Sequence, residues 1–143
     1  MSFESAFGAL NIAASGLGAE RLRMEVVASN IANASVTQTP EGGPYRRRDV
    51  VFETVLSEIA ANGESGLGGV RVAGFVADPS ELPRVYQPGH PDADAEGFVS
   101  MPNVNLPVEM VNLITASRAY EANLRVAHSF LELSQSALAL TRG

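Results

Sequence analysis

Hydrophobic residues recur with helical spacing at both ends of the chain but not in its middle. Residues 3–33 and 107–140 each carry apolar side chains at steps of three and four residues, which is the period of an α-helix. In the first segment, five of these residues are spaced seven apart: Phe3, Leu10, Leu17, Met24 and Ile31. Such a heptad pattern predicts two long helices with coiled-coil-like seams.

Each predicted helix carries a second apolar line on another face. In the first helix this line runs through Ile12, Ala19 and Val26. In the second, Val126, Phe130, Leu133, Ala137 and Leu140 accompany a heptad line through Met110, Leu113, Ser117, Tyr120, Leu124, Ala127, Leu131, Ser134 and Leu138. A helix that is apolar nearly all round is a buried helix. We therefore expect each helix to contact further protein besides its partner. An amphipathic helix that packs only on its own domain is the alternative.

Glycine weakens the first predicted helix. Gly8, Gly16 and Gly18 lie inside it, and each costs about 1 kcal/mol relative to alanine in a helix interior. Such a helix is marginal when isolated and needs contacts with other segments to be stable. The small residues also allow neighbouring backbones to come close.

The middle of the chain reads as short strands and turns. We expect a loop over 35–44, strands over 45–52, 69–77, 84–86 and 98–101, a short amphipathic helix over 52–59, and a mobile glycine-rich stretch over 62–69. The predicted fold class is α+β, with long N- and C-terminal helices pairing as an antiparallel coiled coil around a small β-rich middle segment. The predicted domains are a discontinuous helical domain of residues 1–34 and 104–143, and a β-rich middle domain of residues 35–103.

The composition favours a subunit of a larger assembly. Among the 143 residues, 45% are hydrophobic and only 18% are charged, whereas soluble domains usually carry about a quarter. No apolar run reaches the ~20 residues of a transmembrane helix, so we expect no direct membrane insertion. Residues 5–19 are uncharged, but no basic residue precedes them as a signal peptide requires, so we expect no cleaved signal.

The charge pattern argues against a nucleic-acid partner. The net charge is −6, all ten basic residues are arginine, and the single basic cluster is Arg46, Arg47 and Arg48. This cluster is either a solvated strand face or a set of salt bridges to acidic neighbours in an assembly. The absence of cysteine excludes disulfides and thiolate metal sites.

No motif in the sequence indicates catalysis or a cofactor. His90, Asp92 and Asp94 contain metal-ligating groups, but a structural turn explains them better because no second ligand cluster accompanies them. The glycines of residues 66–69 lack the lysine and the strand-to-helix context of a phosphate loop. We therefore expect no catalytic residue, no cofactor and no bound metal. The paired asparagines of residues 30 and 33, and of residues 103 and 105, are read as caps and turns.

Several separated motifs resemble one protein family. Residues 23–33, which read RMEVVASNIAN, resemble the N-terminal signature of bacterial flagellar rod and hook proteins. Residues 102–105, 109–113 and 116–123 resemble their C-terminal signature, and residues 39–52 and 86–93 are similar to a proximal-rod member. The motifs occur in the family's order and cover nearly the whole chain.

The resemblance implies a non-enzymatic structural subunit of the flagellar basal body. Such proteins leave the cytoplasm unfolded through the flagellar type III export channel and polymerise into a rod that crosses the periplasm. The rod carries motor torque to the hook. The resemblance implies that the terminal helices line the channel, with the β-rich middle outside them. The implied partners are copies of the chain, other rod proteins, the adaptor at the rod base, the MS ring and the export apparatus.

The residues expected at the assembly interface come from both helices and the arginine cluster. They are Leu10, Leu17, Met24, Val27, Asn30, Ile31, Asn33, Arg46, Arg47, Arg48, Met110, Leu113, Tyr120, Leu124, Phe130, Leu131 and Leu138. The alternative function is a soluble coiled-coil adaptor or regulator that binds a single protein partner through a helix groove.

Overall fold

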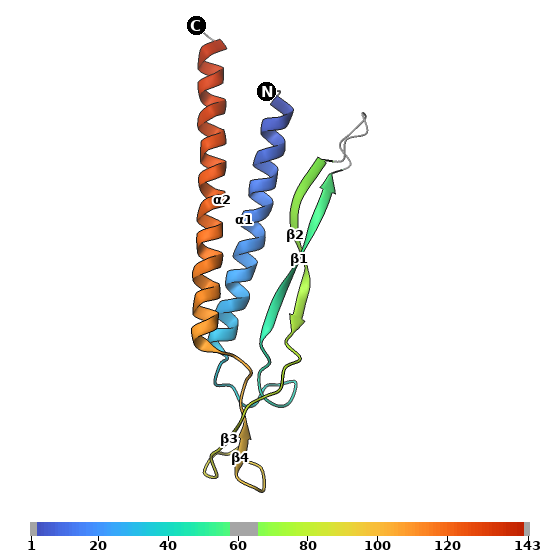
Figure 1. Cartoon of the computed structure of the whole chain (residues 1–143), viewed down its shortest axis with the longest axis vertical. Helices are drawn as coiled ribbons and strands as arrows, with labels where there is room; N and C mark the ends of the chain where they lie inside the picture. Colours follow the sequence, from blue (N-terminus) through green and yellow to red (C-terminus); the bar gives the residue numbers. More distant parts are fainter. Residues whose placement is uncertain (1–2, 58–65, 142–143) are drawn as a thin grey trace. The chain divides into compact units, whose positions relative to one another are not determined.

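The fold has a long helix near each end and four strands between them. The computed structural model describes residues 3–57 and 66–141. The order is α1 (Phe3–Ala32), β1 (Arg48–Ser57), β2 (Gly66–Ala77), β3 (Arg84–Tyr86), β4 (Phe98–Ser100) and α2 (Leu106–Thr141) (Figure 1). This element order confirms the predicted α+β class.

Both helices end within one residue of the predicted bounds, and local side chains satisfy backbone groups at their ends. At the end of α1, the Asn33 side chain donates to the Ser29 carbonyl at 2.8 Å. At the start of α2, Asn105 Oδ1 accepts from the backbone N–H of Val108 at 3.3 Å. The first N–H groups of a helix have no intrahelical partner, and Asn is a favoured residue for capping them. The Ser29 carbonyl also accepts from the Asn33 backbone N–H at 3.0 Å.

The strands form two separate pairs. β1 pairs with β2, and β3 pairs with β4 in antiparallel register, with Arg84 opposite Ser100 and Tyr86 opposite Phe98. The predicted strands over 69–77, 84–86 and 98–101 are confirmed. β1 begins at Arg48, three residues later than expected.

The predicted short helix over 52–59 is wrong for residues 52–57, which continue β1. Phe52, Val55 and Leu56 have helical spacing, but the segment is rich in β-branched residues, and pairing with β2 satisfies its backbone. Ile59 and residues 62–65 of the predicted glycine-rich stretch lie outside the described residues. Residues 66–69 of that stretch belong to β2.

The chain divides into two compact units. Unit 1 comprises Met1–Leu22, Val51–Gly74 and Thr115–Gly143, and unit 2 comprises Arg23–Val50 and Phe75–Ile114. Each unit therefore contains part of both helices and part of the middle segment. The predicted division into residues 1–34 with 104–143 and residues 35–103 stays a prediction.

In unit 1, α1 contacts both β2 and α2. The Ser15 hydroxyl donates to the Ile12 carbonyl at 2.7 Å and accepts from the Val70 N–H at 3.1 Å. On the side of α2, a Cβ atom added to Gly16 would lie 2.7 Å from Nδ2 of Asn123. Gly16 thus permits the close approach that the sequence predicts. Among the described residues, nothing lies within 4 Å of a Cβ added to Gly8 or Gly18.

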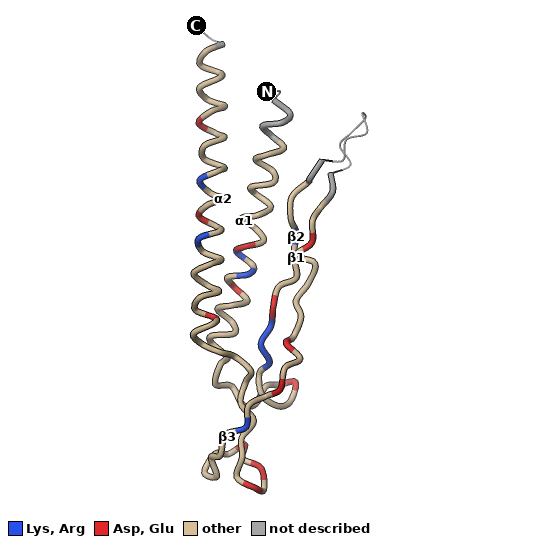
Figure 2. The backbone as a smooth tube through the Cα atoms, viewed as in Figure 1, with Lys and Arg blue, Asp and Glu red and all other residues tan. Residues whose placement is uncertain are grey.

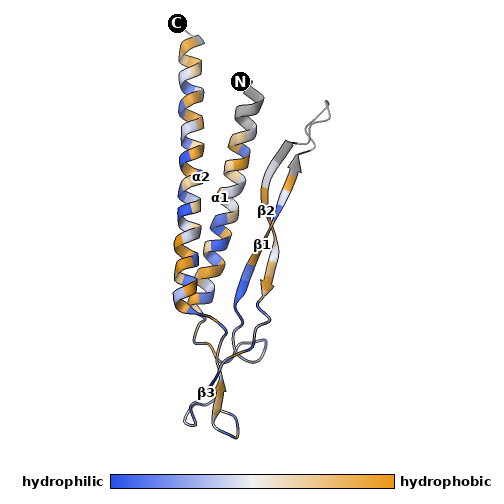
Figure 3. Cartoon of the chain, viewed as in Figure 1, coloured by the Kyte–Doolittle hydropathy of each residue, from blue (hydrophilic) through white to orange (hydrophobic). Residues whose placement is uncertain are grey.

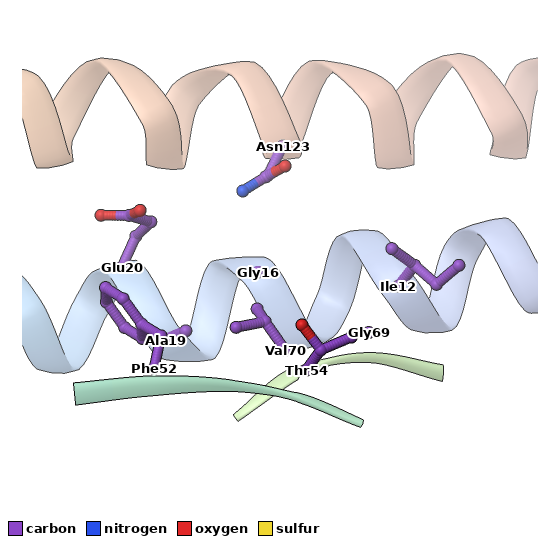
Figure 4. A pocket seen from close by; sticks show the side chains of 9 residues that line it. All are labelled: Ile12, Gly16, Ala19, Glu20, Phe52, Thr54, Gly69, Val70 and Asn123. Atoms are coloured by element: carbon purple, nitrogen blue, oxygen red, sulfur yellow. The ribbon is translucent and has the colours of Figure 1, made fainter. Parts of the chain in front are cut away.

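A pocket of about 320 Å³ opens at this junction of unit 1 (Figure 4). Ile12, Phe52 and Val70 form apolar parts of its wall, and Gly16 and Asn123 line it where the two helices approach. The buried residues around α1 are small, such as Ala13 and Ala19. A core of small residues leaves most large apolar side chains outside it.

Candidate functional site

A cluster of buried polar residues occupies unit 2. Asn30 near the end of α1 and Glu109 in the first turn of α2 are both 0% exposed. Residues 45–48, which lead into β1, bond to both of them. Buried polar groups are almost always hydrogen-bonded, so the partners of this pair define the site.

All the hydrogen-bonding capacity of the Asn30 amide is used. Its Nδ2 donates to the Arg48 carbonyl at 2.8 Å and to Oε2 of Glu109 at 2.9 Å. Its Oδ1 accepts from the Tyr45 hydroxyl at 2.9 Å and from the Arg48 N–H at 3.0 Å. An amide offers two donors and two lone pairs. Asn30 therefore bonds both backbone groups of Arg48, as a neighbouring strand would.

The Glu109 carboxylate receives three donors. Oε1 accepts from Nε of Arg47 at 2.8 Å and from Nδ2 of Asn112 at 3.2 Å, and Oε2 accepts from Asn30. Burial lowers the pKa of Arg47, but its hydrogen bonds to Glu109 and Asp49 and their negative charges outweigh that effect, so the pKa is raised. The Arg47 guanidinium beside the buried Glu109 side chain is therefore charged at neutral pH.

Asn103 connects Arg47 to the turn after β2. Its Oδ1 accepts from the Arg47 backbone N–H at 2.8 Å, and its Nδ2 donates to the Ser80 hydroxyl at 2.9 Å and the Asp78 carbonyl at 3.2 Å. Hydrogen bonds from the Ser80 backbone and hydroxyl hold the pKa of Asp78 below its ordinary value, and the charges of nearby arginines add to this. Asn103 thus ties this turn to Arg47, in addition to the hydrogen bond from the Asp78 N–H to the Arg47 carbonyl at 2.8 Å.

The three arginines of the cluster have different surroundings. Arg46 is exposed and donates to the carbonyls of Asp78 and Ser80 at 3.3 and 3.1 Å. Arg47 forms the buried pair, and the exposed Arg48 guanidinium lies 3.9 Å from the carboxylate of Glu41. Figure 2 shows this basic stretch at the start of β1. Only Arg47 is thus paired with a buried carboxylate of its own chain.

The structure places the predicted interface residues in three groups. Val27 and Asn30 are buried. Leu10, Leu17, Met24, Ile31, Asn33, Arg47, Leu113, Tyr120 and Phe130 are half-buried. Arg46, Arg48, Met110, Leu124, Leu131 and Leu138 are exposed. The buried cluster brings Asn30 together with Arg47 and the backbone of Arg48.

The exposed members on α2 form one line. Met110, Leu124, Leu131 and Leu138 differ by multiples of seven residues and are 60%, 39%, 48% and 51% exposed. We call these four residues the outer line. The positions immediately before them include Glu109, Asn123 and Phe130, which are buried or half-buried. Figure 3 shows apolar residues along the whole of α2. Part of the predicted heptad pattern of α2 thus faces the same chain, and the rest of it faces solvent.

Sequence reasoning misses four residues of the buried cluster as site residues: Tyr45, Asn103, Glu109 and Asn112. Their positions in the sequence indicate only a strand for Tyr45, a turn for Asn103 and a long helix for Glu109 and Asn112. The signal that points to Glu109 is a carboxylate beside the apolar heptad of α2, where a buried charge needs a partner such as Arg47.

The residues considered for a metal site build a turn. His90 Nδ1 accepts from the Asp92 N–H at 3.1 Å. Asp94 Oδ1 accepts from the N–H groups of Phe98 at 2.9 Å and Glu96 at 3.0 Å, and its other oxygen pairs with Arg84. The Phe98 hydrogen bond is the main cause that lowers the pKa of Asp94. Within residues 3–57 and 66–141, no group of three His, Asp or Glu residues is placed to hold a metal ion.

Neither α1 nor α2, over the residues that the structure describes, combines the length and apolarity needed to cross a membrane.

The chain matches two family models and several curated relatives. Residues 10–38 match the model "Flagella basal body rod protein", and residues 95–140 match "Flagellar basal body rod FlgEFG protein C-terminal". The chain is 45% identical to the flagellar basal-body rod protein FlgC of Borreliella burgdorferi, over 96% of this chain and 98% of the relative. It is 46% identical to FlgC of Yersinia enterocolitica, over 91% and 93%. It is 40% identical to FlgC of Bacillus subtilis, over 94% and 97%.

These comparisons confirm the family resemblance seen in the sequence and do not favour the single-partner adaptor. The relatives are structural proteins of the flagellar rod and not enzymes. With identities of 40–46% over more than 90% of this chain and of each relative, the chain belongs to the FlgC family of flagellar basal-body rod proteins, which are structural subunits of that rod.

Proposed function

We propose that the chain polymerises through α1 and α2 into the proximal rod, as part of the torque-transmitting shaft around the export channel. In this proposal residues 1–34 and 104–143 form the inner part of the rod, and residues 35–103 face outward. The neighbours are copies of the chain, other rod proteins, the adaptor at the rod base and the MS ring. The outer line of α2 is the observation that carries the proposal.

The outer line leaves a substantial hydrophobic gain for contacts with other subunits. Fully burying a leucine or methionine side chain stabilises by about 1.5–3 kcal/mol. The members of the outer line are 39–60% exposed, so burying each of them against another subunit would add roughly half of that stabilisation. A heterologous contact that uses such a face and does not close into a ring produces a helical polymer.

Two contacts support an antiparallel coiled coil between the helices. Gly16 approaches Asn123 within unit 1, and Asn30 bonds to Glu109 within unit 2. The two α1 residues are fourteen positions apart, and so are the two α2 residues. Fourteen residues make two heptads, and the pairs run in opposite chain directions, as this pairing requires.

We also propose that the chain passes the flagellar export apparatus unfolded and is placed in the periplasmic part of the basal body. The glycines of α1 lower the stability of this helix in isolation, which suits a chain that is kept unfolded during export and folds once its segments can pack together. Retention of the N-terminal segment is part of the proposal, because Ser15 and Gly16 contribute contacts to the fold.

Motility tests the proposal. Leu124→Asp puts a charge on the outer line, and we expect it to abolish swimming in soft agar. Ser129→Asp is the matched control, since the exposed Ser129 is about 140° around the helix from Leu124 at 100° per residue. Normal swimming of the Leu124→Asp strain would refute assembly through this line.

A further inference from the structure

The apolar contacts of the two helices do not by themselves define one alignment. The half-buried residues Leu10, Leu17, Met24 and Ile31 repeat every seven positions on α1. On α2, Leu113 and Tyr120 are half-buried and also seven apart. If one helix shifts along the other by seven residues, apolar side chains of the two helices again lie opposite each other. Something other than hydrophobic burial has to select the alignment.

We propose that Asn30 and Glu109, together with Arg47, set the register in which α1 and α2 pair. The inference rests on the antiparallel pairing proposed above and adds what selects its alignment. Single buried polar residues in apolar helix seams are an attested means of fixing register. Here the polar pair is fully buried and lies on both helices.

A shift of seven residues in either direction breaks the cluster. In one direction Asn30 faces Ala116, and Glu109 lies beyond the end of α1. In the other, Glu109 faces Arg23, and Asn30 lies beyond the start of α2. In both cases Asn30 loses its carboxylate acceptor, and one member of the pair has no residue of the other helix opposite it. Buried polar groups without partners are strongly destabilising, so the alternative alignments are disfavoured.

The same hydrogen bonds also make the alignment of the two helices depend on residues 45–48. The remaining Asn30 bonds go to Tyr45 and to both backbone groups of Arg48, and Glu109 takes the Arg47 side chain. The selected alignment is therefore the one in which residues 45–48 are also in place. Helix pairing and the start of β1 form together in unit 2.

Cross-linking of introduced cysteines in the purified full chain tests the register directly. The natural chain has no cysteine, so only the introduced pair reacts with a short thiol-specific bifunctional reagent. Val26→Cys with Leu113→Cys reports the native alignment, because these half-buried positions are four residues from Asn30 and Glu109 in opposite chain directions. Val26→Cys with Tyr120→Cys and Ala19→Cys with Leu113→Cys report the two alignments shifted by seven.

We expect only the native pair to cross-link in an otherwise unsubstituted chain. In a chain with Asn30→Leu, Arg47→Met and Glu109→Leu, which keeps similar side-chain volume without polarity, we expect a shifted pair to cross-link alongside the native one. Two results would overturn the inference. The first is an apolar chain linked only through the native pair, which shows that apolar packing selects the register. The second is an apolar chain in which no pair reacts, which shows that the cluster is needed for folding and not for selection.

A matched control replaces polar residues that lie outside the buried cluster. Arg48→Met with Glu41→Leu removes an exposed pair of side chains and leaves the backbone bonds of Arg48 to Asn30. This chain should keep the native cross-link alone. Cross-linking is measured on the purified chain and motility on cells. A failure of the proposed register would therefore not affect the conclusion drawn from Leu124→Asp. A failure of the motility test would likewise not affect the conclusion about the register.

Discussion

Nδ2 of Asn30 lies 2.9 Å from Oε2 of Glu109, and both side chains are completely buried although 79 positions separate them in the sequence. This hydrogen bond joins the end of α1 to the first turn of α2. All three groups that contact the Glu109 carboxylate are donors. Both side-chain oxygens at position 109 therefore have to accept hydrogen bonds.

Replacing this carboxylate by an amide should destabilise the protein. In Glu109→Gln, either orientation of the amide points its NH₂ group at a donor, and Arg47 loses its counter-ion. We expect the free energy of unfolding, measured by urea denaturation, to fall by about 3 kcal/mol, as when one partner of a buried ion pair is removed. The control Glu96→Gln, at an exposed carboxylate, should change it by less than about 1 kcal/mol.

Reversing the polarity of the same bond should recover part of the loss. Asn30→Asp alone places two carboxylates together, which we expect to be as damaging as Glu109→Gln. In the double variant, the glutamine amide introduced at position 109 can donate to the new carboxylate at position 30. We expect the double variant to be more stable than either single variant in the same denaturation experiment. Additive losses would contradict a direct bond between the two positions.

Two glycines of α1 should respond differently to alanine. Gly18→Ala should stabilise the protein by up to about 1 kcal/mol, because alanine favours the helix and nothing described lies within 4 Å of the added Cβ. Gly16→Ala should stabilise less, because its Cβ would meet Asn123 at 2.7 Å unless that side chain moves. Thermal unfolding of both variants measures the difference. The difference should vanish in an Asn123→Ala background, and its persistence there would place the obstruction elsewhere.

Acid should loosen the turn between β3 and β4. The pKa of Asp94 is held below its ordinary value of 3.8, chiefly by the Phe98 N–H and further by Arg84. A lowered native pKa contributes stability that is present above the unfolded value and is lost as pH falls through the lowered one. We therefore expect amide hydrogen exchange of Glu96 and Phe98, compared with a pH-matched unfolded reference, to lose protection only below about pH 3.8.

Asp94→Asn provides the matched variant for this pH dependence. Its Oδ1 still accepts from Phe98 and Glu96, but it has no charge for Arg84 and does not titrate. The acid-dependent loss of protection should therefore be smaller. An unchanged loss would assign the effect to another group, such as Asp78, whose pKa is also lowered.

The helices were predictable because their information is local. The period of apolar residues gives both helices within one residue of their ends. The same reasoning misassigned residues 52–57, because Phe52, Val55 and Leu56 satisfy a helical spacing while β-branched neighbours and pairing with β2 decide for a strand.

The buried cluster was not predictable from periodicity. Its bonds join positions 18, 62 and 79 residues apart, and spacing along the chain carries no information about such contacts. The sequence shows that Arg47 is charged and that Glu109 begins a helix. Only the folded chain shows that the two side chains meet.

A density map of intact basal bodies from cells that carry this chain tests whether it assembles into the rod through α1 and α2. We expect both helices to lie at the inner wall of the proximal rod, with Leu124, Leu131 and Leu138 packed against a neighbouring subunit. A chain located outside the rod, or a line of α2 residues exposed to solvent within it, would contradict assembly through these helices.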